Sequence, residues 1–579
     1  FCGTPCEVAG LKKYLGDGTD LLLTVSMNCS GIASPLVYRK YIDETYDVPH
    51  VKSVDFSSKR FYGSLAGNGV KVELTDDGVQ LTGETRDVYW KSLKYGMNVR
   101  KCCASCKYIY PHEVADITLS KVTSEIDTKI EVLDKEKALT LVSLNTVNAC
   151  EFWKTTKEKL QAVEYRKSRN SVRSRINMHE NRDYFFDLIQ KGTVKKAVNY
   201  ALDGKYDVGV IGLWYGRNYG SMLTYYGLHH VLDSMGLSVL MIDNPLQGEL
   251  EQKLDKTHPR RFAEKHYHIS KVYSLDMLYK LNALCDTFIV GSDQLWNYYL
   301  SRPYRQMYYL DFVDDNKKKI AYGTSFGGTG SFTGNEEEKL RVKSNLERFD
   351  FLSVRENFAK DICYNTFGLN ADKVLDPVFL CDAQIYRNIE EEIVIPDKDY
   401  ILAYILNPEK EKTIALSTIA KKHNCDLYVI LDEPPWEFER NKKAMELPEN
   451  TQVKVLEKVS VGEWLAYIDK ASYVITDSFH GCCFSIILQK QFMAIINKKR
   501  GTKRFPDLMG NFGLLDYLVE TPDELISKDA LDNIISYRRI ETQIEEERKK
   551  SVSWLYNALY SQKQGISLMA YDLVQKHVN

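Results

Sequence analysis

Length and composition are those of a multidomain globular protein. The chain has 579 residues, too many for one hydrophobic core, so we expect about three or four folding units. An apolar fraction of 44%, a charged fraction of 27% and a formal net charge of -2 argue against nucleic acid as a partner. Because no apolar run approaches the roughly 20 residues that span a bilayer, we expect no transmembrane segment and a cytoplasmic protein.

Cysteines are concentrated near the start of the chain. Phe1 is followed at once by Cys2, with neither an initiator Met nor a signal-peptide pattern, so we expect the chain to begin within a longer protein. Seven of the 13 cysteines lie in the first 150 residues. An odd total without a secretion signal argues against a disulfide framework and predicts reduced thiols, some of which could hold a metal cluster.

The first third of the chain is predicted to form one small module and a connector. Short alternating runs separated by glycines favour an α+β module over residues 1–150. Residues 151–205 have a charged, helical pattern. Within them, Tyr165 to Arg182 has few apolar positions, so we interpret 151–205 as a helical connector.

From Tyr206 onward strands alternate with helices. The predicted strands are Tyr206–Gly212, Val239–Ile242, Thr287–Val290, Lys319–Tyr322, Phe351–Val354, Tyr400–Ile405, Leu427–Leu431 and Tyr473–Ile475. Such alternation implies parallel sheets with crossover connections. A break near residues 382–398 predicts two doubly wound α/β domains, 206–390 and 391–579, that face each other across a cleft. Ligands would bind at the carboxyl ends of their strands.

Two polar clusters follow predicted strands of the first domain. Asn218, Gly220 and Ser221 lie where a glycine-containing turn enters a helix, which is the geometry of an anion site, although many strand-to-helix turns need glycine. Ser292 and Asp293 follow the next apolar strand. Ser292 could bind a ligand or cap a helix, and Asp293 could accept a proton from a sugar hydroxyl.

The third cluster ends a strand of the second domain. Thr476-Asp477-Ser478-Phe479-His480-Gly481 follows Tyr473–Ile475 and precedes a helical stretch. His480 does not lie on an apolar helix face, so its imidazole is a candidate for proton transfer near neutral pH. Asp477 either orients His480 or caps the helix.

Together these motifs resemble the polysaccharide pyruvyl transferase family over about residues 206–518. The segments that carry the resemblance are Asn218 to Ser221, Gly291 to Asn297, Leu352 to Glu356, Leu375 to Val378, Thr476 to Gly481 and Arg504 to Leu508. The resemblance implies a fold like the two-domain type B glycosyltransferases, phosphoenolpyruvate as donor, a sugar or glycan as acceptor and a role in exopolysaccharide or cell-surface glycan biosynthesis. Some members carry Arg where this chain has Ser478.

The implied reaction forms a cyclic ketal and requires a general acid, for which His480 is the candidate, with Asp293 or Asp477 as base. The donor is an anion and needs cations, for which Arg355 and Arg504 are the first candidates and Lys498 and Arg500 are alternatives. The full set of predicted substrate-binding residues is Asn218, Gly220, Ser221, Ser292, Arg355, Ser478, Arg500 and Arg504. We expect pyruvyl transfer itself to require no cofactor.

The N-terminal cysteines suggest a second family. Cys103 and Cys106 have CxxC spacing, and Cys6 and Cys29 could complete a metal site, although buried thiols are the alternative interpretation. These segments resemble the C-terminal domain of the coenzyme-reducing hydrogenase and formate dehydrogenase beta-subunit family over about residues 1–195, which implies an iron–sulfur cluster and a flavin. The alternative functions are therefore a flavin and iron–sulfur oxidoreductase with a sugar-binding C-terminal region, or a non-catalytic scaffold.

Overall fold

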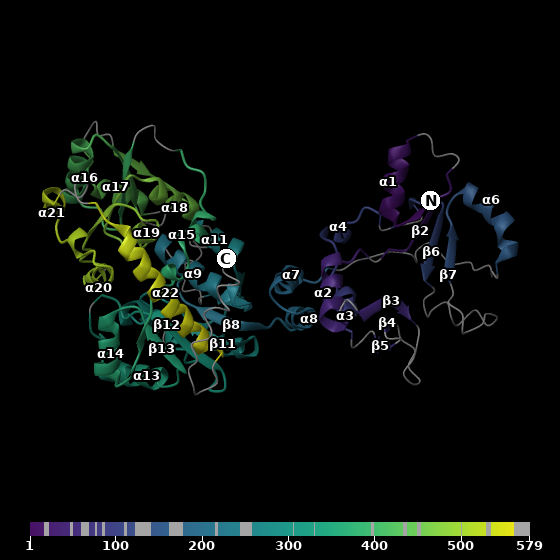
Figure 1. Ribbon diagram of the computed structural model, residues 1–579, viewed down its shortest axis with the longest axis horizontal. Helices are drawn as coiled ribbons and strands as arrows, with labels where there is room; N and C mark the ends of the chain where they lie inside the picture. The colour runs from purple at the N-terminus through teal and green to yellow at the C-terminus, as the bar shows by residue number, and fades with distance from the viewer. Residues whose placement is uncertain are drawn as a thin grey trace. The chain divides into compact units, whose positions relative to one another are not determined.

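The computed structural model shows a chain of two compact units, Phe1–Gly204 and Lys205–Asn579 (Figure 1). It describes residues 1–560 except 17–21, 30, 47–49, 59–68, 76–77, 84–86, 109, 111–112, 122–139, 161–177, 215–217, 244–257, 305, 329, 395–398, 432–436, 448–452, 500 and 529–533. Most of the predicted hydrophilic connector, Tyr165 to Arg182, and the predicted site residue Arg500 therefore lie outside the described residues.

The N-terminal unit contains two small sheets. In the first, β1 (Cys2–Gly3), β2 (Val25–Met27) and β6 (Ile117–Lys121) run parallel, and β7 (Thr140–Leu144) pairs antiparallel with β6. The second sheet is an antiparallel meander of β3 (Val51–Ser58), β4 (Gly69–Leu74) and β5 (Val79–Gly83). The helices are α1 (Pro5–Leu15), α2 (Pro35–Tyr46), α3 (Val88–Lys94), α4 (Lys101–Ala104), α6 (Val147–Thr156), α7 (Arg182–Lys191) and α8 (Val194–Asp203).

Helix α8 belongs to the core of the N-terminal unit. It buries Val194, Ala197, Val198 and Ala201 on one face, and the Glu44 carboxylate of α2 accepts a hydrogen bond from the Val194 amide at 2.7 Å. The helix ends at Gly204, whose φ of 64° is the left-handed conformation that favours glycine at a helix end. The boundary between the two units therefore coincides with a helix C-terminus.

The C-terminal unit is built on two parallel sheets with the same winding order. The first has the order β10-β9-β8-β11-β12-β13-β14 and the second has the order β17-β16-β15-β18-β19-β20. Numbered within each sheet, both begin 3-2-1-4-5-6, the order of a doubly wound dinucleotide-binding fold, which confirms the predicted fold class. The order reverses between β8 and β11 in one sheet and between β15 and β18 in the other, so ligand sites are expected at these two points.

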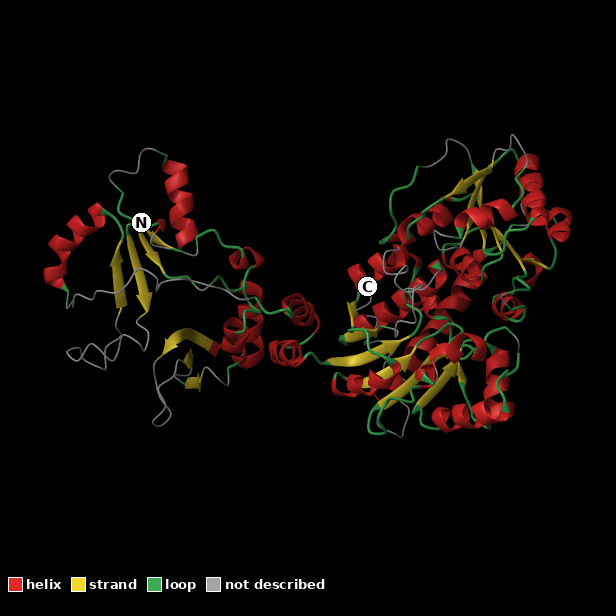
Figure 2. Cartoon of the chain, turned by 180° about the vertical axis from the view of Figure 1, so that it is seen from behind, coloured by secondary structure: helices red, strands yellow, loops and turns green. Residues whose placement is uncertain are grey.

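Strands and helices alternate along the C-terminal unit (Figure 2). Each of the eight predicted strands lies within two residues of an observed strand, whereas β10, β14, β17, β19 and β20 were not predicted. The strands are β8 (Tyr206–Ile211), β9 (Val239–Ile242), β10 (His268–Ile269), β11 (Cys285–Val290), β12 (Lys318–Thr324), β13 (Phe351–Val354), β14 (Asp372–Lys373), β15 (Tyr400–Ile405), β16 (Asp426–Leu431), β17 (Val453–Leu456), β18 (Tyr473–Thr476), β19 (Phe492–Ile495) and β20 (Leu518–Val519). The helices that matter for the site are α9 (Tyr219–Ser234), α16 (Lys410–Lys422), α18 (Val461–Lys470), α19 (Phe479–Ile487), α20 (Arg504–Asn511), α22 (Tyr537–Tyr560) and the 3₁₀ turn η7 (Pro377–Leu380).

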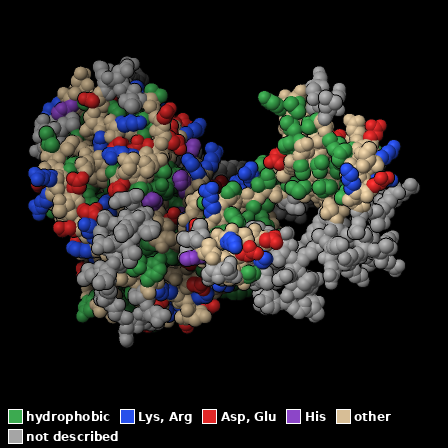
Figure 3. Space-filling view, turned by 45° about the vertical axis from the view of Figure 1, so that its right-hand side comes forward, with side chains coloured by type: hydrophobic (Ala, Val, Ile, Leu, Met, Phe, Trp, Pro, Cys, Tyr) green, Lys and Arg blue, Asp and Glu red, His purple; other side chains and the backbone are tan. Residues whose placement is uncertain are grey.

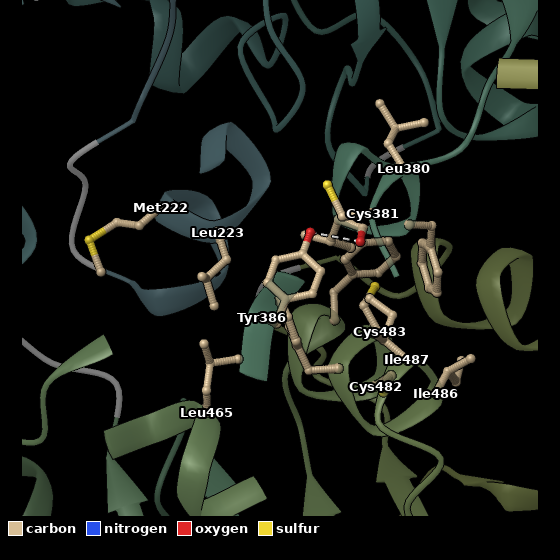
Figure 4. Packing of buried hydrophobic residues seen from close by; sticks show 14 of the residues in the cluster. Met222, Leu223, Leu380, Cys381, Tyr386, Leu465, Cys482, Cys483, Ile486 and Ile487 are labelled. Carbon is tan, nitrogen blue, oxygen red and sulfur yellow. Dashed lines mark hydrogen bonds between the residues drawn. The ribbon is translucent and has the colours of Figure 1, made fainter. Parts of the chain in front are cut away.

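A continuous apolar core joins the two sheets. It contains side chains of α9 and α19 together with Cys381 and Tyr386, which follow β14 (Figure 4). The Tyr386 hydroxyl donates to the Val378 carbonyl at 2.8 Å and fixes η7 within this core. Burial of apolar surface is the main source of stability. The hydrophobic effect that folds each half therefore also holds the two halves together.

The last helix spans both halves of the C-terminal unit. Near its start, the Tyr537 hydroxyl donates to the Lys490 carbonyl, beside β19. Near its end, the indole of Trp554 donates to Asp372 in β14 at 2.8 Å, and Lys318 of β12 donates to the Leu559 carbonyl at 2.5 Å. Figure 1 shows α22 in yellow along this path.

The N-termini of α9 and α19 meet closely. An added Cβ at Gly220 would lie 2.2 Å from the ring atoms of His480, well inside contact distance. Glycine at position 220 therefore allows the N-terminus of α9 to pack directly against His480 at the start of α19.

The described helices and surface add two observations. Among the described residues, none of the helices is both long and apolar enough to cross a membrane. The space-filling view shows Lys and Arg side chains interspersed with Asp and Glu on the visible face of the C-terminal unit (Figure 3).

We predict that residues 205–579 fold without residues 1–204, because the three large apolar core clusters of the C-terminal unit are drawn from residues 208–558. The fragment should unfold cooperatively in urea and retain a near-ultraviolet circular dichroism spectrum. A matched fragment, 219–579, lacks the interior strand β8 and should not fold. An insoluble or molten 205–579 fragment would contradict the prediction.

We also predict that Gly220→Ala destabilises the protein by about 1–3 kcal/mol, because the new methyl group must displace the His480 ring or the helix. The measurement is the free energy of unfolding in urea. Gly510→Ala is the matched control, since Gly510 also lies in a helix and its added Cβ meets only Leu515 Cδ1 at 4.0 Å. Equal free energies of unfolding for the two variants would contradict the prediction, because the α9–α19 contact would then accommodate a methyl group without loss of stability.

Candidate active site

The residues predicted at the start of α9 serve mainly to shape the helix end. The Asn218 side-chain oxygen accepts from the Ser221 amide at 2.8 Å, and the Ser221 hydroxyl donates to the Asn218 carbonyl at 3.0 Å. This is an ordinary N-cap, because it satisfies an amide that the helix leaves unpaired. The structure therefore uses Asn218 and Ser221 as a cap, and Gly220 is the residue of the three that contacts another predicted site residue.

Ser292 and Asp293 lie directly after β11, as predicted. The Ser292 hydroxyl donates to the Gly323 carbonyl at 2.8 Å and accepts from Arg355 Nη1 at 3.2 Å. Asp293 has a φ of 82°, a conformation that costs a non-glycine residue about 1–3 kcal/mol and is concentrated at functional sites. Its Oδ1 accepts from the Gln294 amide at 2.9 Å and from Arg355 Nη2 at 3.3 Å.

Arg355 is the centre of a buried charge cluster, which we call the Arg355 network. Its side chain is 1% exposed. The network consists of Ser292, Asp293, Arg355, Glu356 and Asp376. Arg355 donates through Nε to Glu356 at 3.2 Å and through Nη1 to Asp376, and these carboxylates raise its pKa further above its already high value against the effect of burial. Arg355 is therefore paired with carboxylates of the protein, and its predicted contact with the anionic donor stays a prediction.

Two carboxyl groups on this guanidinium have opposite pKa shifts. Burial raises the pKa of Asp376, but the Arg355 charge and the His480 ring outweigh burial and hold it well below its usual range. Burial also raises the pKa of Glu356, and there the opposing effects of Arg355 and Ser325 are too small to cancel it. Neighbouring carboxyl groups whose pKa values are pushed apart are a common feature of acid–base sites.

His480 lies between the two halves of the unit. Its Nε2 is 3.0 Å from the Thr224 hydroxyl and 3.7 Å from Asp376 Oδ2. The Thr224 hydroxyl donates its single proton to the Gly220 carbonyl at 2.9 Å, so it can only accept from His480. The hydrogen bonds therefore assign a proton to Nε2 and leave Nδ1 as the second ring nitrogen.

Asp477 has a structural role instead of the predicted catalytic one. It is fully buried, and its oxygens accept from the Leu406 amide at 2.6 Å, the Asn407 amide at 3.2 Å and Lys412 Nζ at 2.8 Å. These bonds fix the turn after β15. The alternative prediction that Asp477 caps α19 is also wrong, because Ser478 is the cap and accepts from the Gly481 amide at 3.2 Å.

Arg504 is the predicted cation that remains closest to the site. Its guanidinium lies 5.3 Å from the centre of the Phe479 ring, and that of Arg355 lies 4.9 Å from the same ring. With its amide oxygen turned toward Arg504, Gln294 accepts from both Nη atoms at 3.2 Å. The structure thus brings residues after β11, β13 and β18 and at the start of α20 to one place.

Three residues of the site have no role in the sequence-based predictions. Glu356 and Asp376 occur there only as members of motifs, and Thr224 does not occur. A signal existed for Thr224, because it lies one helical turn after Gly220 on the same face. Asp376 precedes Pro377 and lies three residues after the end of a two-residue strand, which is too short to be recognised from an apolar pattern.

Three of the four predicted metal ligands of the N-terminal unit act electrostatically on the fourth, Cys29. Burial raises the pKa of Cys29, the Gly31 amide that donates to its sulfur at 3.4 Å lowers it, and three other thiols raise it again. Those thiols belong to Cys103, Cys6 and Cys106. Within the described part of the chain, however, no three His, Cys, Asp or Glu side chains are placed closely enough to hold a metal ion.

Comparison with solved structures finds weak likenesses among sugar-nucleotide enzymes. UDP-GlcNAc 2-epimerase from Methanocaldococcus jannaschii has 16% identity and a TM-score of 0.40, with coverage of 57% of this chain and 93% of that chain. An O-GlcNAc transferase mutant from Thermobaculum terrenum has 11% identity and a TM-score of 0.35, with coverage of 65% and 68%. These scores are too low to support an inference about substrates. No curated protein matches the chain.

Two family models match the chain, in the order expected from its motifs. The model of the C terminus of the coenzyme F420 hydrogenase/dehydrogenase beta subunit matches residues 1–168. The polysaccharide pyruvyl transferase model matches residues 218–499, which include Thr224, Arg355, Asp376 and His480. Residues 218–499 therefore match the polysaccharide pyruvyl transferase family, a transferase family, and they follow a region that matches the hydrogenase beta-subunit family in the same chain.

Proposed function

We propose that the C-terminal unit transfers pyruvate from phosphoenolpyruvate to two hydroxyls of a sugar as a cyclic ketal, in the cytoplasmic synthesis of an exopolysaccharide or cell-surface glycan. One observation carries the proposal. Within the region that matches the transferase family, His480 is held by Thr224 and Asp376 at the place where the two sheets meet.

The reaction needs an acid at one carbon and a base at a hydroxyl. Protonation of the donor's methylene carbon produces a methyl group and makes the adjacent carbon electrophilic. One sugar hydroxyl adds to that carbon, phosphate leaves with its bonding electrons, and the second hydroxyl closes the ketal. The two hydroxyl protons balance the proton added to carbon and the proton taken up by phosphate or base.

His480 is the proposed acid. Its Nε2 proton is engaged by Thr224 and faces the Asp376 carboxylate, so we assign proton transfer to Nδ1, which lies against Gly220 and is reached by the donor from beside this contact or after it opens. A carboxylate beside a histidine stabilises the imidazolium form and fixes its orientation. Asp293 is the proposed base, since both hydrogen bonds to its side chain end on Oδ1 and we assign Oδ2 to the sugar proton.

We assign the donor's negative charge to Arg504 and to backbone amides of two glycine turns. Gly328, after β12, and Gly501, after β19, approach so closely that a Cβ on Gly328 would lie 2.2 Å from the Gly501 Cα. Glycine turns allow amide groups to approach a phosphate without interference from side chains. Arg504 supplies a guanidinium beside them, a group suited to carboxylate and phosphate.

A redox role for residues 1–195 is the second candidate, because the hydrogenase beta-subunit-like match, residues 1–168, includes the four cysteines predicted as ligands. Thiol donors are the ligands that iron–sulfur clusters require, and Cys6, Cys29, Cys103 and Cys106 would hold such a cluster. When bound, it would supply one-electron transfer to a flavin. In that case the chain would be an oxidoreductase whose C-terminal region binds sugar.

We predict that His480→Gln lowers phosphate release from phosphoenolpyruvate by about 100- to 10,000-fold, because the variant cannot donate a proton to carbon. Phosphate release and ketal formation are measured with lipid-linked and nucleotide-linked sugars, the latter by mass spectrometry. His423→Gln is the control, since His423 is the C-cap of α16. Wild-type turnover by a folded His480→Gln protein would refute the assignment of His480 as acid.

We predict that the anaerobically purified protein contains iron bound to the N-terminal unit and that Cys103→Ser lowers its content, because one of four thiolate ligands is lost. Iron, zinc and acid-labile sulfide are measured for each protein. Cys150→Ser is the matched control, an exposed thiol outside the group of four. A fully folded wild-type protein without metal would contradict the prediction and leave free thiols at these positions, Cys6 exposed and the other three half-buried.

A further inference from the structure

A cavity of about 210 Å³ lies against the Arg355 network in the C-terminal unit. Its walls come from the ends of β13 and β14 and from η7, α20 and α22. Asp376 and Phe479 line it, and both are neighbours of His480, one in space and one in sequence. A molecule in this cavity, which we call the Asp507 cavity, would therefore contact two neighbours of the proposed acid.

The charges of the Asp507 cavity do not suit the donor. Four carboxyl groups line it, those of Glu356, Asp376, Asp507 and Glu547, against the two cations Arg355 and Lys373. Both cations already have partners in the wall. Arg355 is paired within its network, and Lys373 Nζ donates to Asn511 at 2.9 Å and lies 3.6 Å from Asp507. A ligand that carries phosphate and carboxylate would meet net negative charge here, so the cavity favours a ligand without negative charge.

The other side chains that line the cavity suit a ring that carries hydroxyl groups. Phe379 and Phe512 form a tilted aromatic pair with centroids 5.4 Å apart, which provides an apolar surface. Polar groups that accept hydrogen bonds surround it. Among these, Glu356 has a side chain that is 2% exposed, and its Oε2 has no hydrogen-bond partner among the described residues. Apolar walls with a few fixed polar groups are typical of small-molecule sites.

We propose that the Asp507 cavity is the subsite for the acceptor and takes a neutral sugar ring. The proposal rests on the proposed function and deepens it by naming where the acceptor binds. The volume exceeds the roughly 150 Å³ of a cavity that accommodates benzene, so a six-membered ring with hydroxyl substituents is of suitable size. Carboxyl groups accept from the sugar hydroxyls, and the aromatic pair faces the C–H groups of the ring.

The test fills the cavity from α22. Gln543 lines the cavity, whereas the next residue back, Thr542, is exposed on the same helix, so Gln543→Trp and Thr542→Trp form a matched pair. Binding of the methyl glycosides of glucose, galactose and mannose is measured by saturation-transfer NMR, and binding of phosphoenolpyruvate by calorimetry. We expect the full-length protein and Thr542→Trp to bind at least one glycoside, and Gln543→Trp to bind it about tenfold more weakly with unchanged donor affinity.

Two results would overturn the proposal: failure of the full-length protein to bind any of the three glycosides, or a loss of donor affinity in Gln543→Trp of about tenfold. If Gln543→Trp does not fold, Glu547→Trp, one turn later on the same wall, replaces it and is held to the same outcomes. Failure of the proposed function gives a different result. In that case the protein binds the glycoside in the cavity but neither binds phosphoenolpyruvate nor releases phosphate. The sugar subsite is then supported, and pyruvyl transfer is refuted.

Discussion

The buried guanidinium of Arg355 is the constraint on which the candidate site depends. An ion taken out of water costs several kcal/mol unless charges and hydrogen bonds around it compensate, and removal of one partner of a buried pair costs about 3–5 kcal/mol. Asp293, Glu356 and Asp376 provide that compensation from the ends of different strands. The turns after β11, β13 and β14 are therefore held in register by one cation, and the strained backbone of Asp293 is maintained by the same contacts.

One guanidinium cannot balance the charge of three ionised carboxyl groups. The carboxyl groups Glu356 and Asp376 differ in how readily they ionise. The pKa of Glu356 is raised, so this group resists ionisation, whereas that of Asp376 is lowered and its carboxylate persists. The persistent carboxylate is the one that faces His480. A positive charge on the histidine ring during proton transfer would thus be stabilised by a group that Arg355 keeps ionised. The cation contributes to the proposed chemistry through Asp376.

The order of strands and the positions of polar residues after them could be predicted from the sequence, because buried parallel strands appear as apolar runs. The strands β10, β14 and β20 could not, since two residues carry no pattern, and the four-residue strands β17 and β19 were also not predicted. The hydrogen-bond and ion-pair partners of the polar side chains could not be predicted from the sequence either. Asp477 follows its strand as a catalytic residue would, yet its partner is Lys412, which is 65 residues earlier and becomes a neighbour only through the pairing of β15 with β18. The same limit explains why Asp376, rather than Asp477, proved to be the neighbour of His480.

The shared winding order of the two sheets explains why the site is assembled from distant parts of the chain. The winding order of each sheet reverses once, and the helices that follow β8 and β18 at the two reversals contribute Thr224 and His480, which are 256 residues apart. Two close contacts join the two halves: Gly220 lies against the His480 ring, and Gly328, after β12, lies against Gly501, after β19. Neither contact has room for even one additional carbon atom. The two halves therefore cannot approach further at these points, and a substrate that enters between them must do so beside the contacts or by separating them.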